Sequence, residues 1–222
     1  MRSFCLTIVL VLLTAGMAAG APTFNGYTGL IIVPTADALG MDEFNLGAFS
    51  SDLSPRVETY EVQYGLRDNL EVGAARIRAV GEGHNTVLMG KYLFRAETAG
   101  QAGVAAGIFD PTDEVSSTAY VVMSKTLSPT GSIFEEEFTG IRGTIGFGGG
   151  LLDGIFLGAS AGLGDRLLLM AELVKSDLND EGNHQFNFGA RLNVGGGFRL
   201  HGAFFDNFDD VGFGASYNKI LP

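Results

Sequence analysis

Polar and apolar residues alternate along the second half of the chain, most clearly from Gln185 to Phe204. The odd-numbered positions carry amides, charges and small residues, whereas the even-numbered positions are apolar except at glycines. Alternation with a period of two is typical of a β-strand, because successive side chains leave opposite faces of the sheet. Gly195-Gly196 separates two such runs, which predicts a β-hairpin.

The same pattern recurs along the chain, and no segment shows a sustained helical period. Most connections on one side are tight turns such as Arg67-Asp68, and most on the other are longer and acidic. Because outer-membrane barrels have short periplasmic turns and longer outer loops, we place both barrel ends in the periplasm. We predict strands near residues 43–50, 57–66, 69–79, 85–95, 101–109, 117–126, 138–147, 155–162, 166–175, 185–194, 197–205 and 211–219.

These strands predict an all-β fold, an antiparallel up-and-down transmembrane β-barrel of about 12 strands spanning 43–222. No stretch after residue 22 is apolar enough to cross a membrane as a helix. A closed barrel is the other way to satisfy every backbone group in lipid. The sequence has no Trp, so the aromatic belt is expected from tyrosines, namely Tyr60, Tyr64, Tyr92, Tyr120 and Tyr217.

A secreted soluble β-protein with a closed core shows the same alternation and is the alternative fold. Its outward apolar side chains would need a second sheet to cover them. These side chains include Phe186, Phe188, Leu192, Phe198, Leu200, Phe204, Phe213 and Tyr217.

Residues 1–20 have the features of a cleaved signal peptide. Arg2 precedes an apolar run at 6–13, and small residues follow at 14–21. This signal and the barrel pattern predict a bacterial outer-membrane location. The one cysteine, Cys5, lies within the signal, so we expect neither disulfides nor a thiolate metal site after cleavage.

Residues 21–42 form an N-terminal segment that precedes the barrel. Residues 26–40 read GYTGLIIVPTADALG, and residues 64–73 read YGLRDNLEVG. Both segments resemble YjbH-like proteins, outer-membrane β-barrels associated with exopolysaccharide loci. The resemblance implies a link to exopolysaccharide or envelope biogenesis, and since members of that family are far longer, a single short barrel module. Pro34 cannot donate to a strand ladder, so residues 29–38 form either a short strand or a plug in the periplasmic mouth.

The inward face of the barrel is the candidate functional site. Its mixed charges predict either a structural lumen filled by paired side chains or a narrow transport path. Arg142, Arg191 and Arg199 are expected to pair there with Glu61 and Glu172. For Arg76 and Arg78, which share a face with Val72, the alternation leaves the facing open. The lumen-facing candidates are Glu61, Gln63, Lys91, Arg142, Glu172, Gln185, Asn187, Arg191, Asn193, Arg199 and His201.

No motif for catalysis, a cofactor or a metal is present, so we expect a protein that is not an enzyme. His84 and His184 fall in outer loops and leave an outer-membrane hydrolase as a minor alternative, although no spacing specifies a triad. Residues 177–182 begin like a calcium loop, but Phe188 stands where the bidentate acid belongs.

The partners follow from the charge and the location. The net charge of −11 argues against nucleic acid. Expected partners are outer-membrane lipid and lipopolysaccharide, the outer-membrane assembly machinery and, through the resemblance, polysaccharide or export components.

Overall fold

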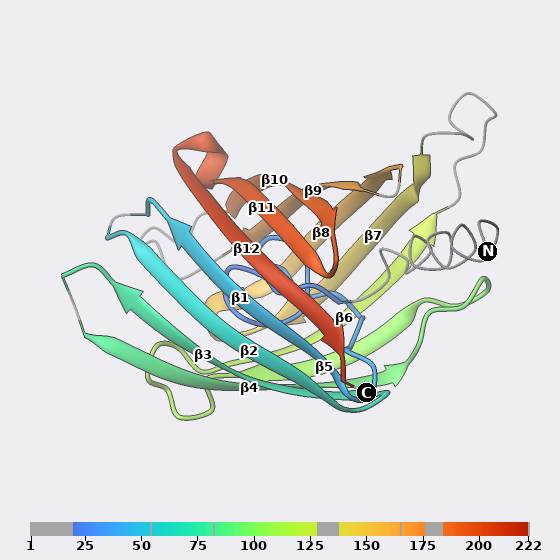
Figure 1. Cartoon of the computed structure of the whole chain (residues 1–222), viewed down its shortest axis with the longest axis horizontal. Helices are drawn as coiled ribbons and strands as arrows, with labels where there is room; N and C mark the ends of the chain where they lie inside the picture. Colours follow the sequence, from blue (N-terminus) through green and yellow to red (C-terminus); the bar gives the residue numbers. More distant parts are fainter. Residues whose placement is uncertain are drawn as a thin grey trace, which may run out of the picture.

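A computed structural model of the chain describes residues 20–53, 55–81, 83–127, 138–164, 166–175 and 184–221. The described residues form twelve antiparallel strands that close into a barrel (Figure 1). The strands are β1 Glu43–Ser51, β2 Val57–Arg67, β3 Leu70–Ala79, β4 His84–Arg95, β5 Gly103–Phe109, β6 Thr118–Leu127, β7 Phe138–Gly148, β8 Gly154–Leu163, β9 Leu167–Lys175, β10 His184–Gly195, β11 Phe198–Phe205 and β12 Asp210–Ile220.

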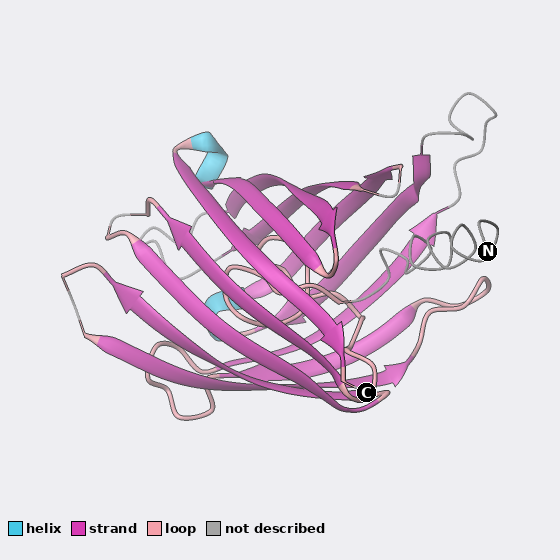
Figure 2. Cartoon of the chain, viewed as in Figure 1, coloured by secondary structure: helices cyan, strands magenta, loops and turns pink. Residues whose placement is uncertain are grey.

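The predicted fold class is confirmed, and every strand lies within two residues of its predicted bounds. Each strand pairs with its neighbours in sequence, and β1 pairs with β12 without a register shift from Glu43↔Ile220 to Ser51↔Gly212. This closing seam leaves no unpaired strand edge, which lipid requires. Helical structure among the described residues is confined to two short 3₁₀ turns, η1 Gly150–Leu152 and η2 Asp206–Phe208 (Figure 2). No described helix is long and apolar enough to cross a membrane.

Apolar side chains cover the outer surface of the barrel. Phe213 and Phe147 are about two-thirds exposed, and many Leu, Ile and Val side chains share their outward face. The described strands form one closed sheet, so no second sheet within the described residues covers this surface as the soluble alternative requires. A single-chain antiparallel barrel with an apolar belt belongs in the bacterial outer membrane, and the predicted location is confirmed.

The N-terminal segment lies inside the barrel. Its blue trace runs through the lumen in Figure 1, enclosed by the strands. Tyr27, Ile31, Val33 and Leu39 are at most 2% exposed. The segment bridges only to itself, at Pro22↔Thr28 and Gly29↔Pro34, and adds no strand to the barrel. We call residues 20–39 the plug. Of the two arrangements open for residues 29–38, the structure has the plug rather than the strand.

The plug explains why several aromatic side chains face inward. The ring of Phe24 packs against Phe49 and Phe205, with centroids 4.8 and 5.1 Å away. The ring of Tyr27 lies 5.6 Å from that of Tyr120. The expectation that Tyr120 belongs to the outer aromatic belt is therefore wrong, because this side chain is buried against the plug.

Some expectations lie outside the described residues. They include the signal peptide, apart from Gly20, and the calcium-like stretch 177–182.

We expect the cost of a charged substitution on the outward face to depend on its depth in the membrane. Leu157 lies near the middle of β8, and its cross-strand neighbours are Ile145 and Leu173. Leu157→Arg should lower the free energy of unfolding by about 2–4 kcal/mol, whereas Ile220→Arg at the end of β12 should cost about 0–1 kcal/mol. Urea unfolding in lipid vesicles measures both. Equal losses would contradict a lipid-facing belt.

Candidate functional site: the plug and its polar anchors

The carboxylate of Glu172 is the central anchor of the plug. Glu172 points inward from β9 and is 2% exposed. It accepts hydrogen bonds from the backbone N–H groups of Ile31 at 2.7 Å, Ile32 at 3.0 Å and Val33 at 2.9 Å. Successive N–H groups that converge on one anion form a backbone nest. The three charge-assisted bonds compensate for burying the charge.

Arg191 binds the backbone carbonyl groups of the same turn, whereas Glu172 binds its N–H groups. From β10, its Nη2 donates to the carbonyl oxygens of Gly29 and Leu30, both at 2.9 Å. The turn needs glycine at position 29, because a Cβ there would lie 2.2 Å from the carbonyl oxygen of Val33. Wall residues on the adjacent strands β9 and β10 thus bind both the donors and the acceptors of one tight turn.

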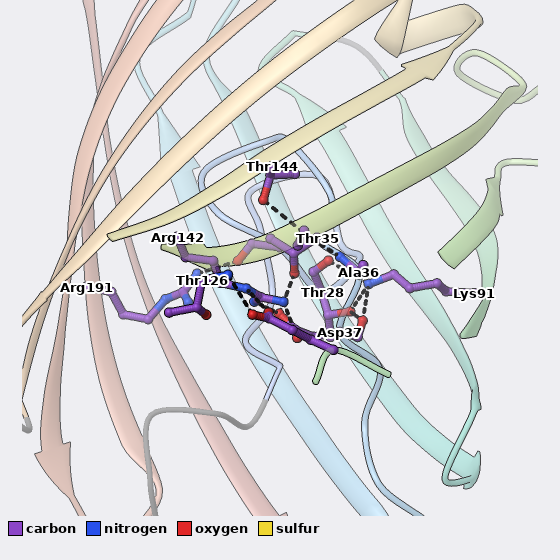
Figure 3. A network of polar contacts seen from close by, with 12 residues as sticks. Thr28, Thr35, Ala36, Asp37, Lys91, Thr126, Arg142, Thr144 and Arg191 are labelled. Atoms are coloured by element: carbon purple, nitrogen blue, oxygen red, sulfur yellow. Dashed lines mark hydrogen bonds and ion pairs between the residues drawn. The ribbon is translucent and has the colours of Figure 1, made fainter. Parts of the chain in front are cut away.

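A second pair of charges holds the plug from β3 and β4. Glu71 and Lys91 form a buried ion pair at 3.4 Å. Lys91 also donates to the carbonyl oxygens of Thr28 at 2.7 Å and Asp37 at 2.8 Å (Figure 3). Glu71 accepts from the Thr28 hydroxyl at 2.7 Å and from the Leu39 N–H at 3.0 Å. The plug is therefore fixed between two walls of the barrel.

A third cluster lies where the plug approaches the β6 and β7 ends. Arg142 on β7 makes a two-point ion pair with Asp37 and donates to Glu97 at 3.1 Å (Figure 3). Burial opposes ionisation of Asp37, but the hydrogen bonds and charge of Arg142 outweigh it and lower the pKa of this carboxyl. Desolvation likewise opposes ionisation of Glu97, but the hydrogen bond from the backbone N–H of Thr126 and the guanidinium of Arg142 lower the pKa of this carboxyl.

The remaining strands also contact the plug. Asn45 on β1 donates to the carbonyl of Gly20 at 2.9 Å, and Ser124 on β6 accepts from Ala36 N–H at 3.0 Å. On β8, glycine leaves room for the plug, because a Cβ at Gly158 would lie 2.6 Å from Leu30 Cδ1. The interior is thus occupied by chain 20–39, which contacts the wall on all sides.

The sequence-predicted site residues lie on the inward faces of their strands and divide into two groups. Gln63, Lys91, Arg142, Glu172 and Arg191 contact the plug directly. The others belong to the wall. His201 forms a hydrogen bond with Ser216 at 2.8 Å, Asn187 donates to Glu172 at 3.5 Å, and Asn193 accepts from the Gly195 N–H. The remaining wall residues are Gln185, Glu61 and Arg199.

The expected pairing of arginines with Glu61 and Glu172 is wrong. Arg142 pairs with Asp37 of the plug, and Arg191 with backbone carbonyls. Glu172 accepts from backbone N–H groups, and neither carboxylate oxygen of Glu61 has a hydrogen-bond partner among the described residues. Glu71, Asn45, Ser124 and Asp37 are contacts that the inward-face prediction missed. The facing left open for Arg76 and Arg78 is outward.

Other chemistry is sparse in the described parts of the chain. No group of three or more His, Cys, Asp or Glu side chains within them is placed to hold a metal ion. His84 begins β4 and His184 begins β10, and both are exposed.

Comparison with known proteins agrees with this geometry at the level of the fold. No protein-family model and no curated protein matches the chain. Solved structures do match. The KdgM porin is similar with a TM-score of 0.56 and 7% identity, over 78% of this chain and 98% of that one. The Acinetobacter baumannii outer membrane protein Omp33 has a TM-score of 0.51 and 11% identity, over 81% and 98%.

The chain has the fold of an outer-membrane porin. A second KdgM structure, in complex with disordered oligogalacturonate, is similar with a TM-score of 0.53 and 7% identity, over 79% of this chain and 98% of that one. Sequence identity at this level supports the shared barrel and nothing finer.

We expect Glu172→Gln to loosen the plug, because the amide loses the charge that three N–H groups bind. The loss of about 2 kcal/mol corresponds to more than a tenfold rise in exposure of the plug. A cysteine at Ala36, buried in the wild type, reports this exposure through its rate of reaction with a membrane-impermeant thiol reagent. Glu61→Gln is the matched control, since it removes a buried inward carboxylate that holds no plug atom. Equal labelling of the two variants would contradict the role of Glu172 as an anchor of the plug.

Acid should also loosen the plug. The pKa of Asp37 is lower when it is bound by Arg142 than when the segment is released, so release takes up a proton. The stabilisation is therefore present above the ordinary Asp pKa of about 3.9 and is lost as the pH falls below it. The labelling rate of the Ala36→Cys reporter, divided by that of a fully exposed cysteine at the same pH, should rise between about pH 5 and pH 3; the division corrects for the smaller thiolate fraction in acid. Asp37→Asn should show faster labelling at neutral pH and a weaker response to acid, and an unchanged response would contradict this role.

Proposed function

We propose that this protein is a narrow transport module of the outer membrane that its own N-terminal plug closes at rest. The observation that carries the proposal is the way the plug is held. Charged wall residues, Glu172 and Arg191 on one side and Glu71 and Lys91 on the other, bind its backbone.

This mode of holding suits a segment that leaves and returns. The twelve strands complete their hydrogen bonding without the plug, which adds no strand to the sheet. Its polar anchors are hydrogen bonds that water replaces at a net cost of about 0.5–1.5 kcal/mol each, or about 1.5–3 kcal/mol where a charge takes part. After release, the inward charges and amides would face a wet lumen, and residues 40–42 would keep the plug tethered to β1.

The sequence resemblance gains support from where its two segments lie. Residues 26–40 form most of the plug, and residues 64–73 form the turn and strand start that hold it. Thr28 and Leu39 bond Glu71 across the two segments. At Gly65, a Cβ would lie 1.9 Å from the carbonyl oxygen of Gly40. We therefore propose a short YjbH-like barrel, in which the shared residues encode one plug-and-wall contact.

A link to envelope or exopolysaccharide biogenesis follows from that resemblance. A structurally similar barrel is described in complex with a disordered oligogalacturonate, which supports a saccharide as the class of solute. Lipopolysaccharide, the barrel assembly machinery and polysaccharide export components are the partners that fit this role.

A structural barrel with the plug as its permanent core is the second candidate. The observation that favours it is the aromatic packing of Phe24 and Tyr27 against inward rings of the wall. In this case the plug would contribute to folding rather than to gating.

Planar-bilayer conductance of the wild type and of a variant that joins Gly20 directly to Gly40 tests the proposal. We expect little or no steady conductance from the wild type and a steady, larger conductance from the variant. Heat-modifiable gel mobility shows whether the variant folds. A variant that does not fold would support the structural candidate. A wild type that conducts like a general porin would refute closure at rest, and a folded variant that stays silent would refute transport.

A further inference from the structure

Two arginines stand on the membrane-facing surface of β3, close to the end that leads into loop 80–83. Arg76 and Arg78 are exposed, whereas Ala75 and Ile77, which alternate with them along the strand, face the interior. The outward neighbours of Arg76 across the two strand pairs are Tyr60 on β2 and Thr86 on β4.

The charge of this patch is only partly compensated within the protein. Arg78 makes a 3.5 Å ion pair with Glu58, but its side chain remains 45% exposed. No carboxylate of the described residues lies within 4.0 Å of Arg76. Other cations at the same end of the barrel are paired more closely, Arg56 with Asp52 at 2.7 Å and Lys175 with Asp153 at 2.5 Å.

The surroundings place the patch at the level of lipid head groups. Towards the middle of the barrel, the outward face continues with the exposed apolar side chains Val62 and Leu88. A lipid-facing arginine is tolerated near the membrane interface and not at its centre. Tyr60, 55% exposed, has the amphipathic ring that is favoured at this level. The long acidic loops mark this end as the outer one.

We propose that Arg76 and Arg78 bind a phosphate group of the outer-leaflet glycolipid, the phosphorylated diglucosamine of lipid A. Guanidinium groups match phosphate with two parallel hydrogen bonds. Positions i and i+2 of a strand lie about 6.6 Å apart, so both side chains reach one phosphate group. Thr86, the cross-strand partner of Arg76, carries a hydroxyl that can serve as a further donor. In a chain of net charge −11, this membrane-facing pair supplies the local positive charge that a phosphate requires.

Native mass spectrometry of the detergent-solubilised barrel with added lipid A tests the proposal. We expect the wild type to retain bis-phosphorylated lipid A and the Arg76→Gln, Arg78→Gln double variant to retain at least tenfold less. Dephosphorylated lipid A should bind the wild type as weakly as the double variant binds the phosphorylated form. The matched control is Arg67→Gln with Lys219→Gln, which removes two exposed charges at the other end of the barrel and should leave retention unchanged.

Heat-modifiable mobility first shows that each variant is folded, and Arg76→Lys with Arg78→Lys keeps the charge if the glutamine variant fails. This lysine variant should bind between the wild type and the glutamine variant. Equal loss in the matched control, equal binding of dephosphorylated lipid A, or full displacement by inorganic phosphate or phosphatidylglycerol would overturn the proposal. An epitope tag at Gly81, in the adjoining loop, should be accessible on intact cells, and an inaccessible tag would overturn the outer-leaflet assignment.

Discussion

The interior of this protein depends on the carboxylate of Glu172, which three consecutive backbone N–H groups of the plug surround. A closed barrel of twelve strands satisfies its own backbone hydrogen bonds, so the strands do not need the plug as a hydrogen-bonding partner for their backbone. The side chains that do need partners are the charged residues facing the lumen, which must be paired or hydrated. Arg191 and Lys91 meet the same need through backbone carbonyls. The plug is therefore a partner for charges of the wall as well as a filler of space.

The barrel was predictable from sequence because lipid enforces strict alternation along each strand. Phe186, Leu192 and Leu200 are outward and Asn187, Arg191 and His201 are inward, as the alternation predicts. The sequence pattern gave the wrong environment for Tyr120, because an aromatic ring in this protein can pack either against lipid or against the plug. The facing of β3 stayed open for a related reason. Arg76 and Arg78 lie on the outward face with Val72, and Glu71 lies on the inward face with Gly73 and Ala75, so each face mixes charged with small or apolar residues.

The contacts of the site were less predictable than its wall residues. Glu172, Lys91 and Arg191 stood out as charges on an inward face, but they bind backbone atoms, which every residue carries and no residue pattern marks. Glu71 was missed on the face that looked apolar. A signal existed in the repeated hairpin turns Gly65–Asn69 and Gly162–Arg166, each followed by an acid on the next strand. Those two acids, Glu71 and Glu172, are the carboxylates that hold the plug.

The junction between the plug and β1 shows where movement of the plug would stop. Gly40 N–H donates to Glu43 at 2.9 Å, and the backbone of Asp42 bonds Gly65 on β2 and Leu221 after β12. Tyr64 adds a 2.5 Å bond to the Asp42 side chain. These contacts join the junction to both strands that flank β1 at the barrel seam. In the proposed function, a plug that detaches from Glu172 and Glu71 would pivot before Gly40 and leave the seam intact, so opening of the lumen would require no unfolding of the wall.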